Sequence, residues 1–298
     1  MEIQSQQTGQ TQKEHFSAFL RELVQKFNPE TVYCFGKMVE QKTGDGCFMQ
    51  SIREEKYTYF LLMVTESITR IEHEVQDFAN QNYPHGTITL LVHGRETVVQ
   101  AIKANNRFFI MVCNSGQIIY SRNGMLEPSE TLSFIPTQGA VKAQKHFDHR
   151  MPLATGFLAS ANECLKNGQY GVCAFMAHQV TEQCCILLIR IYLAYRSDMH
   201  NLYRQLRLCN SFSTAPHWLF LSGGEDEKRL FDIMVRSYSA ARYKDDFRVS
   251  QKDAEQLFIN VSNFIKLTEI LCVKKIESLA EDAEAYKQNK LESGAENG

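Results

Sequence analysis

The sequence has no excess of charge of either sign. Its 298 residues include 32 lysines and arginines against 34 aspartates and glutamates, for a formal net charge of −2. A near-neutral chain does not coat nucleic acid through bulk charge, although a local basic patch is compatible with it. We therefore expect no reader of DNA sequence, whereas a local site for a nucleotide or RNA stays open. The 44% apolar and 22% charged residues also exclude a globally disordered, collagen-like or coiled-coil chain.

Targeting and membrane-spanning segments are also lacking. The first residues, MEIQSQQTGQTQKEH, are polar and contain no apolar core, so we expect no signal peptide. The longest apolar stretch, Cys184 to Tyr195, is interrupted by Arg190 and is shorter than the ~18–20 residues that span a bilayer. These absences predict a cytoplasmic protein that does not enter a membrane.

No CxxC motif occurs among the nine cysteines, and their number is odd. Most of them fall in apolar segments, which is typical of reduced, buried thiols in a reducing compartment. We therefore expect no disulfide framework, no metal site and no cofactor.

The first part of the chain alternates helix and strand signals, which predicts a mixed α/β domain over residues 12–123 after a flexible tail at 1–11. Prolines and few periodic apolar residues mark a linker at 124–137. The expected elements are a helix ending at Asn28-Pro29, strands at 31–35, 57–64 and 87–92, a loop at 37–55, helices at 67–82 and 95–104, and a hairpin at 107–120 with its turn at Asn114-Ser115-Gly116.

Strand signals stop near residue 138, and only helical periodicity follows. This pattern predicts an antiparallel helical bundle over 138–277 and an overall α+β fold. The charged tail 278–298 is expected to fray. The five predicted helices cover 138–167, 170–195, 199–209, 225–243 and 251–277.

The first domain resembles the minimal nucleotidyltransferase (MNT) family. One strand ends in Cys34-Phe35-Gly36, and the next apolar strand begins at Tyr57. The resemblance implies that a Gly-Ser after the first strand cradles the triphosphate and that an Asp-x-Asp on the next binds magnesium, because two hard oxygen ligands must hold the metal on the transferring phosphates. Here Lys37 replaces the serine, and the second strand reads Tyr57-Thr58-Tyr59. The resemblance therefore implies a degenerate site at Gly36, Lys37, Tyr57 and Tyr59, without metal.

The second domain resembles HEPN domains (higher eukaryotes and prokaryotes nucleotide-binding), which are commonly fused to MNT units. Three short motifs in order carry this resemblance, and together they span about 140–275. They are Ala174 to Gln183 on the second predicted helix, Met199-His200-Asn201-Leu202 at the start of the third, and Ser239 to Asp246 at the end of the fourth.

Polar residues of these motifs are the candidate binding groups. His178 and Glu182 stand at i and i+4, so they share one face of an otherwise apolar helix. Such a stripe indicates either a groove or a satisfied structural network. His200 either belongs to the groove or bonds a neighbouring carbonyl, and the residues that end the fourth helix form either a surface ion-pair cluster or a phosphate- and base-binding surface. The predicted groove for a nucleotide, RNA or a partner comprises His178, Gln179, Glu182, His200, Arg242, Tyr243 and Asp246.

Catalytic motifs are incomplete in both halves. HEPN ribonucleases use an arginine followed after four to six residues by a histidine, but no histidine follows Arg242, and only three residues separate Arg196 from His200. RNA cleavage without metal needs a proton-transferring group beside a phosphate-binding one. We therefore assign no catalytic residue and expect a pseudoenzyme.

The resulting hypothesis is a non-catalytic regulatory module that binds a nucleotide, RNA or a partner. The resemblance implies a toxin–antitoxin or defence-like setting and a homodimer through the helical bundle. The alternative is an enzyme, either a HEPN-type ribonuclease or a residual nucleotidyltransferase.

Overall fold

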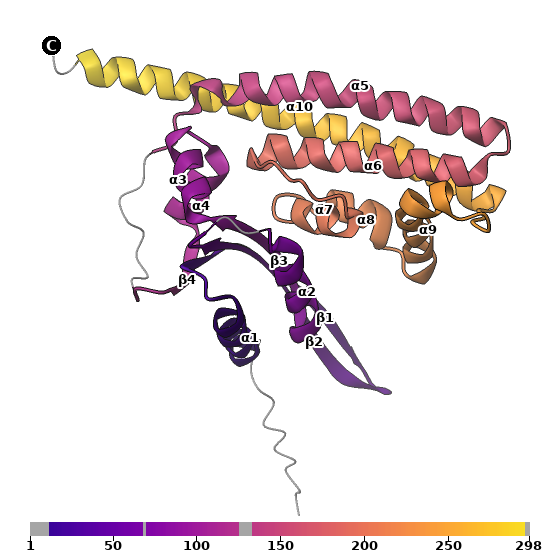
Figure 1. Ribbon diagram of the computed structural model, residues 1–298, viewed down its shortest axis with the longest axis horizontal. Helices are drawn as coiled ribbons and strands as arrows, with labels where there is room; N and C mark the ends of the chain where they lie inside the picture. Colours follow the sequence, from indigo (N-terminus) through magenta and orange to yellow (C-terminus); the bar gives the residue numbers. More distant parts are fainter. Residues whose placement is uncertain (1–11, 68–69, 125–132, 296–298) are drawn as a thin grey trace, which may run out of the picture. The chain divides into compact units, whose positions relative to one another are not determined.

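The chain divides into two compact units, Met1–Ser133 and Phe134–Gly298. The structure is a computed structural model that describes residues 12–67, 70–124 and 133–295; for residues 42, 49–54, 294 and 295 it describes the backbone alone. The predicted α+β class is confirmed, because the first unit holds a sheet with helices, and all regular elements among the described residues of the second unit are helices (Figure 1). The expected tail 1–11 and residues 125–132 of the expected linker lie outside the described residues.

The first unit is built on a four-stranded sheet in the order β3-β2-β1-β4. Strands β2 and β3 are parallel, and the other neighbours are antiparallel. Its elements are α1 (Gln12–Phe27), β1 (Thr31–Gly46), β2 (Met49–Thr65), α2 (Glu72–Asn82), β3 (Gly86–Gly94), α3 (Arg95–Lys103), α4 (Arg107–Ser115) and β4 (Gln117–Ser121).

Helices cover both faces of this sheet, which explains the uninterrupted apolar run of β2. One core cluster joins Leu61 and Met63 of β2 to Leu23 of α1 and Val75 of α2. On the other face, α3 contacts β2 and β3, and α4 contacts β1. The intervening Leu62 is therefore fully buried as well.

The loop expected at 37–55 is wrong, because these residues form most of a long hairpin. Strand β1 continues through Gly36 to Gly46, where it pairs with Met49 of β2. Figure 1 shows this ribbon extending beyond the rest of the sheet. Glu40 and Gln41 are exposed, so no apolar alternation marks this part of β1, and periodicity could not reveal it.

The hairpin expected at 107–120 is also wrong in its first arm, which is the helix α4. A continuous apolar run such as RFFIMVC fits either a buried strand or a buried helix. The local signal that decides is Asn106, whose side chain accepts a hydrogen bond from the Phe108 amide at 3.0 Å. This is an N-cap, and it starts a helix.

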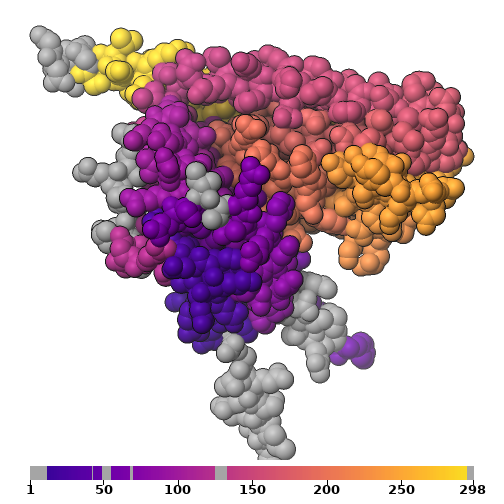
Figure 2. Space-filling model, viewed as in Figure 1, coloured from indigo at the N-terminus to yellow at the C-terminus, as the bar shows by residue number. Residues whose placement is uncertain are grey.

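The second unit contains three long helices that contact one another, α5, α6 and α10, with shorter helices beside them. Figure 2 shows the atoms of α5 as a continuous layer along the top of this unit. The helix α8 was not predicted, and α7 begins three residues later than expected, because Asn201 caps it through a hydrogen bond from the Arg204 amide at 3.1 Å. The elements are η1 (Pro136–Gln138), α5 (Gly139–Lys166), α6 (Tyr170–Leu193), α7 (Leu202–Cys209), α8 (Ala215–Leu221), α9 (Glu225–Tyr243) and α10 (Gln251–Ala295).

Within the part of the chain that the structure describes, two helices would suffice by length and composition to cross a membrane: α6 and the Gln251–Ser293 part of α10. The core helix of a soluble protein satisfies the same criteria, and most of α6 is buried in the second unit. This finding is weak evidence for a membrane span.

The charged tail expected to fray after residue 277 is instead helical as far as Ala295. Leu279 is 2% exposed and Ala283 is 6% exposed, so one side of this extension is packed. The start of α5 lies against it, since a Cβ on Gly139 would be 3.6 Å from Leu279 Cδ2. Two apolar residues four apart lie on one side of the helix here, a signal that the surrounding charges obscured.

This packing predicts that Leu279→Ala destabilises the second unit by about 2–4 kcal/mol, because a buried leucine leaves a cavity. Leu291→Ala is the matched control on the same helix, since Leu291 is 74% exposed and its loss should change stability by less than about 0.5 kcal/mol. Urea unfolding followed by the fluorescence of Trp218, the single tryptophan, reports on this unit. Equal stabilities of the two variants would show that the extension does not pack.

Candidate functional site

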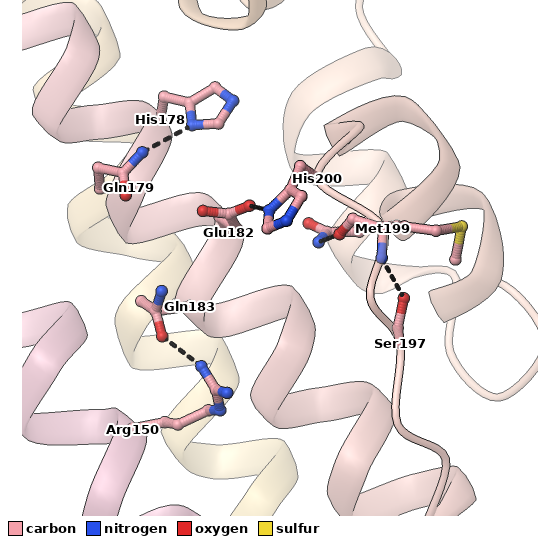
Figure 3. A network of polar contacts seen from close by, with 9 residues as sticks. Arg150, His178, Gln179, Glu182, Gln183, Ser197, Met199 and His200 are labelled. Atoms are coloured by element: carbon pink, nitrogen blue, oxygen red, sulfur yellow. Dashed lines mark hydrogen bonds and ion pairs between the residues drawn. The ribbon is translucent and has the colours of Figure 1, made fainter. Parts of the chain in front are cut away.

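A polar network crosses the buried face of α6 in the second unit (Figure 3). His178 is 2% exposed and Glu182 is 5% exposed, although both are polar. Buried polar groups need partners, because an unpaired carboxylate in an apolar interior is costly. The network supplies these partners from α5, from the segment that connects α6 to α7, and from α9.

Glu182 is paired with His200. The Glu182 Oε1 atom accepts a hydrogen bond from His200 Nδ1 at 2.8 Å. The His200 side chain is 70% exposed, whereas that of Glu182 is 7% exposed. This contact fixes a proton on Nδ1 and leaves Nε2 toward solvent. A carboxylate partner therefore replaces the neighbouring carbonyl considered for His200.

His178 is held as a neutral imidazole. Burial first, and then the nearby charges of Arg242 and His200, lower the pKa of His178 from the ordinary 6.5 to about 4. Its ring stacks on Tyr238 with centroids 4.8 Å apart. The Gln179 amide lies 3.3 Å from His178 Nδ1, which suits an imidazole with its proton on Nε2.

Arg242 lies among aromatic rings at the end of α9. Its guanidinium carbon is 4.4 Å from the Tyr238 centroid, 5.1 Å from that of Tyr243 and 5.5 Å from that of Phe175. Arg242 Nε donates to the Tyr238 carbonyl oxygen at 2.7 Å. Among the described residues no carboxylate pairs with this guanidinium, and the side chain is exposed. Tyr238 therefore lies between a neutral histidine and a free cation.

Two further arginines lie near the network and were not predicted as part of it. Arg150 of α5 donates from Nη1 to Gln183 Oε1 at 2.5 Å. Burial lowers the pKa of Arg150, and the charge of Glu182 raises it. The pKa of Arg190 is lowered by burial and then by Arg196 and Arg150. Arg150 carries no local sequence signal, because it reaches the site only through the packing of α5 on α6, whereas Arg190 lies on α6 itself.

Of the predicted groove, His178, Gln179, Glu182, His200 and Arg242 are brought together, and Tyr243 borders them through its contact with Arg242. Tyr243 is 76% exposed. Asp246 is exposed beyond the end of α9 and makes no hydrogen bond or ion pair with a described residue. It is not part of the network.

The predicted degenerate site in the first unit lies on the β1–β2 ladder. Gly36 pairs with Phe60, and Lys37 pairs with Tyr59. Lys37 Nζ lies 4.7 Å from the Tyr57 ring centroid and 5.7 Å from that of Tyr59. The four residues do gather, but β1 continues through Gly36 as a strand, so its backbone forms no turn that could cradle phosphates. Over the described residues, no three His, Cys, Asp or Glu side chains gather as a metal site requires.

Comparison with known proteins bears on the second unit. Residues 150–271 match the HEPN domain family. The second unit carries a HEPN domain. The match runs from Arg150 of α5 into α10, so the HEPN domain contains every member of the polar network.

The remaining comparisons add little. A solved nucleotidyltransferase-like protein from Exiguobacterium sibiricum 255-15 is similar at 12% identity, over 90% of this chain and 80% of that chain, with a TM-score of 0.28. A likeness this weak carries no argument about fold or function. No curated protein matches the chain.

The lowered pKa of His178 makes the stability of the HEPN domain depend on pH. Between pH 6.5 and about 4 the unfolded chain binds a proton that the folded chain does not, so stability falls as pH falls. From pH 7 to pH 5 we expect His178 to contribute a loss of about 2 kcal/mol. In His178→Gln this contribution should be absent, which urea unfolding at both pH values measures. An equal pH dependence in the two proteins would contradict a buried neutral His178.

Proposed function

We propose that the HEPN domain binds a phosphate-bearing ligand, a nucleotide or RNA, on the face of α6 where His200 and Arg242 lie. We propose further that it does so as a regulatory module without catalytic activity. The observation that carries this proposal is the exposed guanidinium of Arg242, held by three rings and by no carboxylate among the described residues.

The aromatic surroundings suit Arg242 to phosphate recognition. Arginine presents a rigid fork of donors, and stacking on rings fixes its plane before a ligand arrives. Only Nε is engaged with the protein, through the Tyr238 carbonyl, so the terminal N–H groups can meet a phosphate. The exposed ring of Tyr243 beside it offers a surface on which a base can stack.

Neighbouring cations extend this surface. Arg150 and Arg190 lie close enough that the charge of Arg150 lowers the pKa of Arg190. The acidic groups that face them are Glu182, which is buried and paired with His200, and Asp198, which pairs with Arg196 at 3.1 Å. A surface that gathers like charges in this way favours an anionic partner.

Catalysis is not favoured by this arrangement. His178 is buried and neutral, so it cannot give a proton to a leaving group near neutral pH. For the first unit we propose a degenerate nucleotidyltransferase, since Tyr57 and Tyr59 stand where the carboxylates would and β1 forms no turn at Gly36. A pseudoenzyme of this kind fits a regulatory role in a cytoplasmic toxin–antitoxin or defence-like system.

Ribonuclease activity is the second candidate, because His200 is exposed and a buried carboxylate orients it. This histidine–carboxylate pair could move a proton beside the phosphate-binding arginines. If so, a labelled RNA should be cut in the presence of a chelator, and His200→Gln should abolish the cleavage.

Binding is tested with Arg242→Gln. We expect the affinity for a fluorescein-labelled single-stranded RNA, measured by fluorescence anisotropy, to fall about tenfold, because a charge-assisted contact to phosphate is lost. Arg236→Gln is the matched control on the same helix, since Arg236 is exposed and only its Nε contacts the Asp232 carbonyl, at 3.3 Å. That control should change affinity by less than about twofold.

Unchanged affinity in Arg242→Gln would contradict the binding proposal. Cleavage of the RNA by the unmodified protein, lost in Arg242→Ala, would contradict the non-catalytic role and make the chain an enzyme. Repeating the titration with labelled ATP distinguishes a mononucleotide from an RNA ligand.

We also propose that the protein forms a homodimer through the helical unit. Ile259, Ile270 and Val273 of α10 are 50%, 65% and 43% exposed, and their spacing places them on one side of that helix. An exposed apolar stripe of this kind is typical of an interaction surface.

Sedimentation velocity at tens of micromolar should therefore show a dimer that Ile270→Glu converts to a monomer. Val172→Glu, at a 39% exposed position of α6, is the control that should leave the dimer intact. A monomer in the unmodified protein at these concentrations would rule the dimer out.

A further inference from the structure

A cavity of about 640 Å³ opens in the first unit, beside α3 and the start of β1. Its volume lies within the roughly 300–1,000 Å³ typical of small-molecule sites. The walls are half apolar and half polar, and their apolar part comes from β1, β2, α3 and α4. This apolar part is formed by Tyr33, Val64, Val98, Val99, Ile102 and Cys113.

The cavity exists because the helices on this face leave part of the sheet uncovered. Helix α3 contacts β2 and β3, and α4 contacts β1, but the first residues of β1 and the end of β4 border open space. The parallel strands β2 and β3 both finish at this edge, at Thr65 and Gly94. Sheets of this kind commonly bind ligands beyond the carboxyl ends of their strands.

The walls offer apolar surface that an organic ligand would cover. Val99 is 39% exposed, and Ile102 and Tyr33 are half-buried. Covering such surface gains roughly 25 cal/mol per Å². Burial, and next to it the Cys113 thiol, raises the pKa of Tyr33 to about 12, so its hydroxyl stays neutral and keeps its proton.

The charged residues at the rim include Arg95 and Arg122, and each of these arginines faces one carboxylate. Arg122 is engaged, because its Nη1 lies 3.0 Å from Glu66 Oε2 and its Nη2 lies 2.6 Å from the Asn28 carbonyl oxygen. Arg95 is less occupied. It forms a long ion pair with Glu30, with Nη1 3.6 Å from Glu30 Oε1 and beyond hydrogen-bond distance, and its side chain is 69% exposed, so its guanidinium can still meet an anion.

We propose that this cavity binds a small amphipathic anion, with an apolar body between α3 and Tyr33 and a carboxylate or phosphate head on Arg95. The site differs from the Gly36 region, which lies further along β1 and takes no part in the lining. It is independent of the ligand proposed for the HEPN domain, since every lining residue belongs to the first unit.

The test uses the full chain with ¹³C-labelled valine and isoleucine methyl groups. Octanoate, octyl phosphate and octanol are the probes, which separate a carboxylate head, a phosphate head and an uncharged head. We expect octanoate or octyl phosphate to shift the methyl signals of Val98, Val99 and Ile102, with octanol binding about tenfold more weakly. Arg95→Gln should lower the affinity for the anionic probes about tenfold and leave octanol unchanged. Arg21→Gln, at an exposed position of α1, is the matched control and should change none of these affinities.

Absence of methyl shifts with all three probes at millimolar concentration would overturn the site. Equal binding of octanol and the two anions, unaffected by Arg95→Gln, would overturn the anionic head. Ile102→Trp, which places a large ring in the cavity, should block all three probes. Shifts that persist in that variant would place the binding elsewhere.

Discussion

The hydrogen bond between the buried Glu182 carboxylate and His200 constrains the architecture around the candidate site. Burying a carboxylate in the apolar interior of a helical bundle destabilises the fold by several kcal/mol unless a partner compensates the lost hydration. This loss of stability is on the order of that caused by the most destabilising single mutations. His200 supplies the compensation from the chain segment between α6 and α7. That segment is irregular, and Ala194 at its start has φ 56°, so specific contacts must fix it.

Those contacts surround the pair and hold His200 in place. The Met199 amide bonds to Ser197 Oγ at 3.3 Å, and Gln205 Nε2 donates to the Met199 carbonyl at 2.6 Å. The buried carboxylate thereby positions an exposed imidazole. On the neighbouring turn of α6, the neutral His178 ring stacks on Tyr238. The Tyr238 ring in turn lies against the guanidinium of Arg242. The buried residues Glu182 and His178 and the exposed residues His200 and Arg242 therefore belong to one network.

Much of this network could be predicted from the sequence, for local reasons. The i, i+4 spacing of His178 and Glu182 places both on one helix face, and helix geometry makes that inference safe. This spacing argument could not find Arg150. It lies on α5, far in sequence from its partner Gln183 on α6, and the two residues meet only because α5 packs on α6. Tyr238 is half-buried, and its contact with Arg242 depends on side-chain direction at the end of α9. In the first unit, α4 was missed because an apolar run does not distinguish strand from helix, and the long hairpin was missed because its exposed residues show no apolar alternation.

The neutral state of His178 beneath the proposed phosphate-binding surface can be measured by an NMR pH titration of its imidazole in the full chain. The His178→Gln variant assigns the signal. The structure predicts that the ring keeps its proton on Nε2 and stays neutral until the pH approaches about 4, because burial, Arg242 and His200 all oppose a second proton. A titration midpoint near the ordinary 6.5 would show that His178 is accessible to solvent, and it would contradict this description of the site.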